Sequence, residues 1–256
     1  MAGSTHCTVA LCQATAKPLD VAYNLSKITE GMRRAAGAGA DLVIFGELFL
    51  AEYASVAGAD TARDLKRVAE EKNGASFIKI SATAKENGIA VIYGYPEVDR
   101  SSGEENYYNS AQFVDKNGCS LLNYRKVHLW APTEGKSFTP GSECPVVDWN
   151  GINIGVLICY DLDFPEAMRS LAQKGAQFVP VLTATADLQY DNISKIVIPA
   201  KALENQVYVA YANYTGGSYI GLSHLANSLG RTVVCAGSEE ALYILVAQIN
   251  IKTTQC

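Results

Sequence analysis

One cysteine of this chain stands where a nucleophile could work. Cys159 follows the apolar run of residues 152–158, and Pro165 comes six residues later. Proline suits the first turn of a helix, so Cys159 is expected in a turn between a strand and a helix. Such a turn exposes a nucleophile and places backbone N–H groups beside it that can stabilise an oxyanion. The pattern predicts nucleophilic catalysis at Cys159, against the plainer interpretation of a buried structural cysteine.

A carboxylate ends a second apolar run. Glu47 follows residues 41–46 and precedes the apolar residues 48–50. A carboxylate among apolar neighbours is costly to bury unless it is paired, and burial raises its pKa towards the range of a general base. We therefore predict that Glu47 is the base, the alternative being an ordinary glutamate at the rim of the fold.

A lysine ends a third run. Residues 121–124 lead into Arg125 and Lys126. A lysine ammonium near a cysteine favours the thiolate and can carry the charge of a developing oxyanion. Lys126 is therefore a candidate oxyanion stabiliser, and the alternative is that Arg125 and Lys126 form a solvated basic pair.

Two other chemistries could use Cys159. The first is a Cys–His hydrolase with His128 as the base, and it predicts that replacing His128 by alanine abolishes activity. The second is a thiol-redox role. Asp161 and Asp163 are expected to raise the pKa of the thiol, and no cysteine near Cys159 in the sequence could resolve a disulfide. The first alternative has few bases to choose from, because His6, His128 and His224 are the only histidines in the chain.

These residues must be held by elements that alternate between strands and helices. The strand runs are nearly continuously apolar, which favours strands covered on both faces, and the Asn-Gly at residues 117–118 predicts a hairpin. We therefore expect an α/β fold, with a mixed sheet assembly and outer helices. Strands are expected at residues 9–13, 42–45, 89–95, 109–114, 120–124, 152–158, 178–183, 207–212, 231–235 and 242–249, and helices at residues 24–36, 76–86, 165–174 and 196–205.

Composition narrows the class of protein. The chain has 256 residues, 48% of them hydrophobic, and no linker or low-complexity stretch, so residues 1–256 are expected to form one domain. The net charge is −5 without a basic arm, which argues against nucleic acid as a partner. No apolar run reaches about 18 residues and the first eight residues do not resemble a signal peptide, so we expect no membrane association and no export.

The seven cysteines are odd in number and scattered, with no Cys-x-x-Cys pair. This distribution favours neither a disulfide framework nor a zinc site. It suits a reducing compartment, and we expect a cytoplasmic protein.

Three segments together resemble the signatures of the carbon–nitrogen hydrolase (nitrilase) superfamily, in the order of that family. They are GELFL at residues 46–50, YRKVHL at 124–129 and ICYDLDFPE at 158–166. Further landmarks are FTPG at 138–141, ALEN at 202–205 and YAN at 211–213, so the resemblance covers nearly the whole chain. The chain departs from the family pattern at Lys201, where arginine is frequent, and within residues 223–230.

The resemblance implies a four-layer αββα sandwich and a triad of Cys159, Glu47 and Lys126. It also implies a second glutamate in the site, which would be Glu134, and neither a metal nor an organic cofactor. We expect the substrate-binding residues to be Tyr53, Trp130, Tyr160, Thr183 and Ala184.

Family resemblance also favours one activity over its neighbours. Cys-Tyr-Asp with Phe-Pro-Glu resembles the amidase branches, whereas nitrilases tend to have Trp-Glu after the cysteine. A small carboxamide is therefore the expected substrate, with nitriles and N-carbamoyl compounds as alternatives and a catalytically silent scaffold as the non-enzymatic one. The resemblance and the apolar segment 241–251 suggest a homodimer or a higher homo-oligomer.

Overall fold

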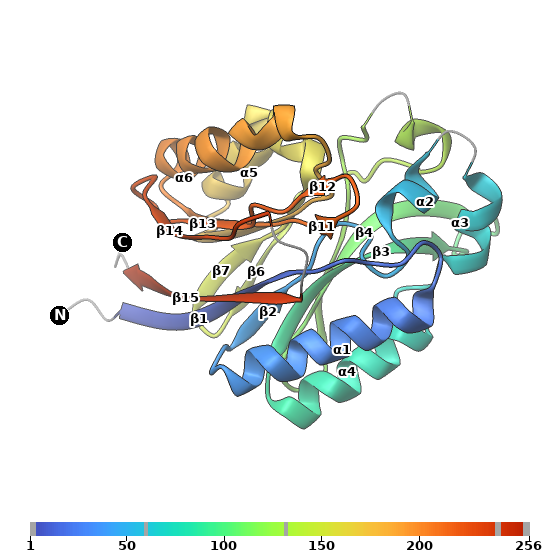
Figure 1. The fold of residues 1–256 in the computed structure, drawn as a ribbon, viewed down its shortest axis with the longest axis horizontal. Helices are drawn as coiled ribbons and strands as arrows, with labels where there is room; N and C mark the ends of the chain where they lie inside the picture. The colour runs from blue at the N-terminus through green and yellow to red at the C-terminus, as the bar shows by residue number, and fades with distance from the viewer. Residues whose placement is uncertain (1–3, 59–60, 131–132, 239–241, 253–256) are drawn as a thin grey trace.

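Two β-sheets form the centre of the molecule (Figure 1). The computed structural model describes residues 4–58, 61–130, 133–238 and 242–252. Within those residues the first sheet has the strand order β15-β1-β2-β3-β4-β5 and the second has β14-β13-β10-β9-β7-β6, with β8 paired to β9. The strands of the first sheet are β1 (Ser4–Gln13), β2 (Leu42–Ile44), β3 (Ala90–Asp99), β4 (Asn106–Val114), β5 (Ser120–Arg125) and β15 (Tyr243–Lys252). Those of the second are β6 (Val146–Trp149), β7 (Ile152–Gly155), β8 (Leu157–Ile158), β9 (Phe178–Leu182), β10 (Tyr208–Ala212), β13 (His224–Ala226) and β14 (Thr232–Cys235).

Helices cover the outer face of each sheet (Figure 1). Helices α1 (Val21–Gly37) and α4 (Ala75–Asn87) lie on the first sheet, and α5 (Pro165–Gln173) and α6 (Ile198–Asn205) lie on the second. The short helices α2 (Tyr53–Ala57) and α3 (Ala62–Val68) lie beside one end of the first sheet, and β11 (Thr215–Gly216) pairs with β12 (Tyr219–Ile220) as a small ribbon. The order of layers is α, β, β, α, which confirms the expected fold class.

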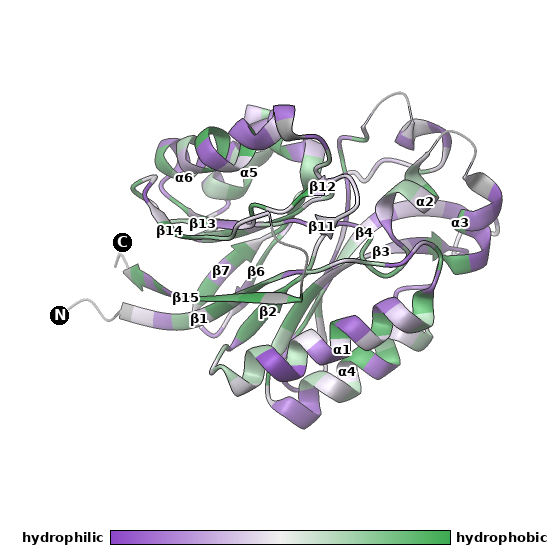
Figure 2. Cartoon of the chain, viewed as in Figure 1, coloured by the Kyte–Doolittle hydropathy of each residue, from purple (hydrophilic) through white to green (hydrophobic). Residues whose placement is uncertain are grey.

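Burial on both faces of the strands explains their continuous apolar runs (Figure 2). In β2, Leu42 and Ile44 enter the core between the two sheets, whereas Val43 packs under α1 and α4. The side chains alternate in this way because successive residues of a strand point to opposite faces. All three are fully buried, so the run contains no polar position for solvent.

The structure differs from the expected elements in several places, and it contains α2, α3, β6, β11, β12 and β13, which the sequence did not predict. The strand expected at 152–158 is divided into β7 and β8, and β7 forms a hairpin with β6 through Asn150 and Gly151, both at positive φ. This Asn-Gly is the same hairpin signal as the one at 117–118, and the sequence prediction overlooked it. The helix expected from residue 196 begins earlier, with a π-helical turn over Ile193–Val197. The wider turn precedes Pro199, whose ring nitrogen cannot donate a helical hydrogen bond.

The apolar C-terminal segment is used within the chain itself. β15 pairs antiparallel with β1 along its whole length, and Leu245, Ile249 and Ile251 are buried in the core. Ala241, the first residue of the segment considered above, lies outside the described residues. The apolar character of this segment is therefore accounted for without a second subunit. None of the described helices is long and apolar enough to cross a bilayer.

Candidate active site

Cys159 occupies a sharp turn between β8 and α5. Its φ of 45° is positive, a conformation that costs energy for a residue with a side chain and that is typical of exposed nucleophiles in strand-to-helix turns. The 3-10 helix Cys159–Asp163 follows at once, and α5 begins at Pro165. Because N–H groups in the first turn of a helix have no intrahelical acceptor, the N–H of Tyr160 is available to a ligand.

Asp161 stabilises this turn through hydrogen bonds to the residues around it. Its buried carboxylate accepts hydrogen bonds from the backbone N–H of Ile158 at 3.0 Å and from the Tyr124 hydroxyl at 2.6 Å. It also accepts from the backbone N–H of His128 at 2.8 Å and lies 2.9 Å from the Nδ1 atom of that ring. The edge of the His128 ring thus contacts Asp161, whereas one face of the ring stacks on Phe164, with centroids 3.8 Å apart. His128 is thus part of a network that joins the end of β5 to the cysteine turn.

Glu47 lies just beyond the end of β2, in contact with the second sheet. Its backbone N–H donates to the carbonyl of Thr183 at 3.3 Å, and the Thr183 hydroxyl hydrogen-bonds Cys159. Gly46 makes this close approach possible, because a Cβ there would lie 3.0 Å from the carbonyl oxygen of Thr183 and 2.7 Å from the ring of Tyr214. Thr183, the residue that directly follows β9, therefore contacts both Glu47 and the cysteine.

A fully buried cluster of charges surrounds Glu47. The Nζ atom of Lys126 lies 2.7 Å from Oε1 of Glu47 and 2.9 Å from Oε1 of Glu134. The side-chain amide of Asn109 donates to the same two oxygens, at 2.8 Å and 3.3 Å. Oε2 of Glu134 accepts from the backbone N–H of Trp130 at 2.7 Å, whereas Oε2 of Glu47 is buried and has no hydrogen-bond partner among the described residues. One carboxylate oxygen in this cluster is therefore left open to a ligand or a proton.

Burial and neighbouring charges shift the pKa values of Glu47, Lys126 and Cys159. Burial raises the pKa of Glu47 to about 7, although Lys126 acts in the opposite direction. Burial works against the charge of Lys126, but the carboxylates of Glu47 and Glu134 outweigh it and raise the pKa of the lysine. Burial, and then the charge of Glu47, raise the pKa of the Cys159 thiol to about 12. The thiol is therefore neutral at rest and needs a base before it can attack.

The sequence prediction about this thiol was right in direction and wrong in cause. The carboxylates that raise the pKa of Cys159 are Glu47 and Glu134, and not Asp161 and Asp163. Asp161 is instead occupied by the network below the turn. Nearness in sequence was a poor guide to nearness in space.

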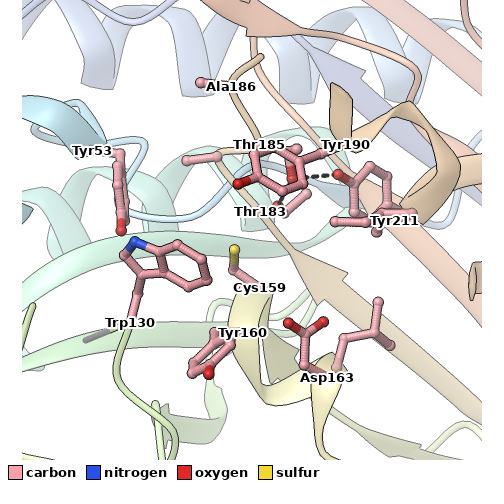
Figure 3. A pocket seen from close by; sticks show the side chains of 13 residues that line it. Tyr53, Trp130, Cys159, Tyr160, Asp163, Thr183, Thr185, Ala186, Tyr190 and Tyr211 are labelled. Carbon is pink, nitrogen blue, oxygen red and sulfur yellow. Dashed lines mark hydrogen bonds between the residues drawn. The ribbon is translucent and has the colours of Figure 1, made fainter. Parts of the chain in front are cut away.

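The cysteine opens onto a cavity of about 270 Å³. This volume suits a small substrate, because ligand sites in proteins usually measure about 300–1,000 Å³. In Figure 3 the sulfur of Cys159 points into the space between Trp130, Tyr53 and Thr183. The residues expected to bind substrate all border this cavity: Tyr53, Trp130, Tyr160, Thr183 and Ala184. Others that the sequence did not single out border it too: Leu162, Asp163, Thr185, Ala186, Tyr190, Ile193 and Tyr211.

Asn109, which does not line the cavity, is a further residue of the site that the sequence analysis missed. It is fully buried and holds Glu47 and Glu134 together through one amide group. A buried amide requires partners, but β4 also carries the buried polar residues Ser110 and Gln112, so Asn109 did not stand out in the sequence. Among the described residues, no group of three His, Cys, Asp or Glu side chains is arranged to hold a metal ion.

Comparison with known proteins places the chain in a family. The carbon–nitrogen hydrolase family model matches residues 8–255. The chain is 40% identical to a "hydrolase in pqqF 5'region" of Pseudomonas protegens, over 92% of this chain and 81% of that protein. It is 34% identical to an (R)-stereoselective amidase of Pseudomonas sp., over 94% of this chain and 85% of that protein.

Solved structures give the same result. An amidase from Nesterenkonia sp., in its cysteine-to-alanine form with bound butyramide, superposes with a TM-score of 0.81 at 30% identity, over 97% of this chain and 92% of that one. Another form of that amidase carries the acetamide moiety of fluoroacetamide covalently on its active-site cysteine. The chain therefore belongs to the carbon–nitrogen hydrolase family, the nitrilase superfamily that its three sequence segments indicated.

Proposed function

We propose that this protein is an amidase that hydrolyses a small carboxamide to a carboxylic acid and ammonia through a thioester on Cys159. One observation carries the proposal. A neutral thiol in a strained turn shares its surroundings with a buried carboxylate, Glu47, that has one free oxygen and an ammonium partner in Lys126. The amidases named above are relatives of this chain, and their activity supports the same reaction here.

In the first half-reaction Glu47 accepts the proton of the thiol while the sulfur of Cys159 attacks the amide carbon. The carbonyl oxygen becomes an oxyanion, which the ammonium of Lys126 and the backbone N–H of Tyr160 stabilise. The C–N bond then breaks, and ammonia leaves with the proton that Glu47 received. A pKa near 7 suits Glu47 to both transfers, because a proton can move either way at neutral pH.

In the second half-reaction Glu47 takes a proton from water, which attacks the thioester. The carboxylic acid leaves and the proton returns to the sulfur of Cys159. Glu134 holds Lys126 from the opposite side and accepts a hydrogen bond from the Tyr53 hydroxyl, so it positions the lysine and the wall of the cavity. No metal or organic cofactor enters these steps.

Ammonia release tests the proposal. The assay covers short aliphatic amides, glutamine-like ω-amides, N-carbamoyl amino acids and nitriles, with Cys159→Ser as the control. We expect release from carboxamides to exceed release from nitriles, and the Ser variant to fold normally but to lose nearly all activity. A preference for nitriles or carbamoyl compounds would reassign the activity within the family. No release from any compound would favour a silent scaffold.

Assembly and location are part of the proposal. We expect a homodimer or a higher homo-oligomer, as the family resemblance implies, and a monomeric mass by light scattering at micromolar concentration would contradict it.

A cytoplasmic location agrees with the state of the described cysteines, of which Cys7, Cys12, Cys119, Cys144, Cys159 and Cys235 are all free thiols. The seventh, Cys256, lies outside the described residues.

A further inference from the structure

Asp163 is the only charged side chain among the described residues that line the cavity. It lies four residues after Cys159, at the end of the 3-10 helix, and in Figure 3 its carboxylate points up into the space beside Cys159, on the side of Tyr211. The proposed reaction does not use this group, because Glu47 and Lys126 already supply the base and the oxyanion partner. Its place on the wall therefore bears on which substrates enter.

The carboxylate of Asp163 is not satisfied by the protein. It accepts no hydrogen bond and forms no ion pair within 4.0 Å with any residue in the described part of the chain. Lys201, the cation that acts on it most strongly, is itself paired with Glu204 at 3.3 Å. Asp163 is an exposed residue, but the partial burial of its carboxylate still raises its pKa, because the charged form has lost some of its water. A positive group on the substrate would offset that loss.

The rest of the wall also suits a cation better than an anion. Aromatic rings from several segments border the cavity, and they come from Tyr53, Trp130, Tyr160, Tyr190 and Tyr211. The negative face of such rings attracts ammonium groups and repels carboxylates. Lys126 lies behind the cavity wall, where the proposed reaction assigns it to the oxyanion, and no lysine or arginine among the described residues lines the cavity itself, so a carboxylate at the far end of a substrate would find no counter-ion there.

We infer that Asp163 gives this site a preference for amides whose acyl part carries an ammonium group, and makes it discriminate against amides that carry a carboxylate. The inference rests on the proposed amidase function and names the substrate class within it. Asp163 acts as a specificity-determining residue that contacts the substrate away from the reacting carbon. Its effect should fall on kcat/KM through KM, because the contact is made equally in the ground state and in the transition state.

A matched series of amides tests the inference. Each compound has an acyl chain of two to four methylenes that ends in a methyl, an ammonium or a carboxylate group, so that length and shape stay constant while charge changes. For the wild-type protein we expect kcat/KM to follow the order ammonium, methyl, carboxylate at one or more lengths. Asp163→Asn should lower kcat/KM for the ammonium compounds by roughly threefold to tenfold relative to the methyl compounds of the same length. Asp163→Lys should reverse the order of the charged compounds.

Glu166→Gln is the control, because it removes the same charge from an exposed residue of the same segment that does not line the cavity. It should leave the order of substrates unchanged. The inference is overturned if the ratio of ammonium to carboxylate compounds changes less than twofold in Asp163→Asn at every length. It is equally overturned if Glu166→Gln changes the ratio as much. If the methyl compounds are hydrolysed but charge makes no difference to kcat/KM, the proposed amidase function stands and only the role of Asp163 is overturned. If folded protein hydrolyses none of the compounds, both proposals are overturned.

Discussion

Two neighbouring cations, Arg125 and Lys126, end up in opposite surroundings. Each binds two carboxylates: Arg125 contacts Glu97 at 2.5 Å and Asp99 at 2.7 Å, and Lys126 contacts Glu47 and Glu134 at 2.7 Å and 2.9 Å. The side chain of Arg125 is 29% exposed, whereas that of Lys126 is completely buried. Each cluster thus has one cation and two carboxylates. Arg125, Glu97 and Asp99 form the outer cluster, and Lys126, Glu47 and Glu134 form the inner cluster, on opposite faces of one sheet.

The clusters differ in whether their hydrogen bonds are complete. Both oxygens of Glu97 are used, one by Arg125 and the other by Ser110 and Asn123. Oε2 of Glu47 in the inner cluster has no partner among the described residues. A complete network holds three strands together, whereas an incomplete one keeps an acceptor ready for a proton. Chemistry is thus indicated by what a charge cluster leaves unsatisfied, and not by its having charges.

Removing the base should give the largest difference between the clusters. Glu47→Gln keeps the shape of the side chain but cannot accept the thiol proton or activate water, so both half-reactions should slow, by about 10³-fold or more in kcat. Glu97→Gln is the matched change in the outer cluster, and its folded fraction should keep its activity within about threefold. The measurement is steady-state ammonia release corrected for folded protein. Equal losses in both variants would remove the distinction between the clusters.

Replacing each cation should give the next largest difference. Lys126→Ala removes charge from the place where the oxyanion forms, and it should lower kcat by roughly 10²-fold to 10³-fold. It also leaves two buried carboxylates without their partner, which should destabilise the fold by about 3–5 kcal/mol. Arg125→Ala should change kcat little.

Single-turnover kinetics with an activated ester separates the roles of Glu47 and Lys126. The good leaving group lessens the need for a proton donor, but the reaction still passes through an oxyanion. Acyl-enzyme formation from the ester should therefore remain slow in Lys126→Ala. If Lys126→Ala slows this step far less than Glu47→Gln does, the two roles are assigned wrongly.

The pH profile should follow the inner cluster. Burial raises the pKa of Glu47 to about 7, and only its ionised form can take the thiol proton, so kcat/KM should fall about tenfold per pH unit below that value and level off above it. His128→Gln is the control, since His128 belongs to the network of Asp161. Loss of the acidic limb in that variant would favour a Cys–His mechanism.

The smallest effect should be the loss of stability when Arg125 is removed from the outer cluster. Arg125 is partly exposed, so its ion pairs are screened by solvent. Arg125→Ala should lower the free energy of unfolding by about 1 kcal/mol, and the difference from wild type should shrink in high salt. Urea unfolding at two ionic strengths measures this change. A loss as large as that of Lys126→Ala would mean that burial does not separate the two clusters.

The sequence predicted a strand before each of Glu47, Lys126 and Cys159, although the strand expected before Cys159 is divided into β7 and β8. It also contained a signal for which cation enters the core. Lys126 has the same parity as the buried Leu122 and Tyr124, whereas Arg125 has that of the half-buried Leu121 and Asn123. Alternation along β5 therefore separates the pair, but Leu121 is apolar as well, so the sequence alone left the assignment open.

The wall of the cavity was less predictable. Tyr190 and Ile193 come from a segment with a 3-10 turn and a π-helical turn, and neither has a periodicity that can be recognised in a sequence. Asp163 was noticed only as a charge near Cys159, because its place on the wall depends on how the 3-10 helix is oriented. Such residues converge through tertiary packing, and no local pattern specifies it. The expectation of one domain over residues 1–256 stays a prediction.

The pairing of β15 with β1 has a consequence for how the molecule forms. The partners run from Gln13 with Tyr243 to Ser4 with Lys252, so the two strands meet only after a very long loop has closed. Contacts between such distant segments slow folding, and until β15 arrives the hydrogen-bonding edge of β1 is open to other chains. During synthesis on the ribosome, the sheet beside Glu47 and Lys126 therefore stays incomplete until residues 243–252 have emerged, and the open edge of β1 favours aggregation during that interval.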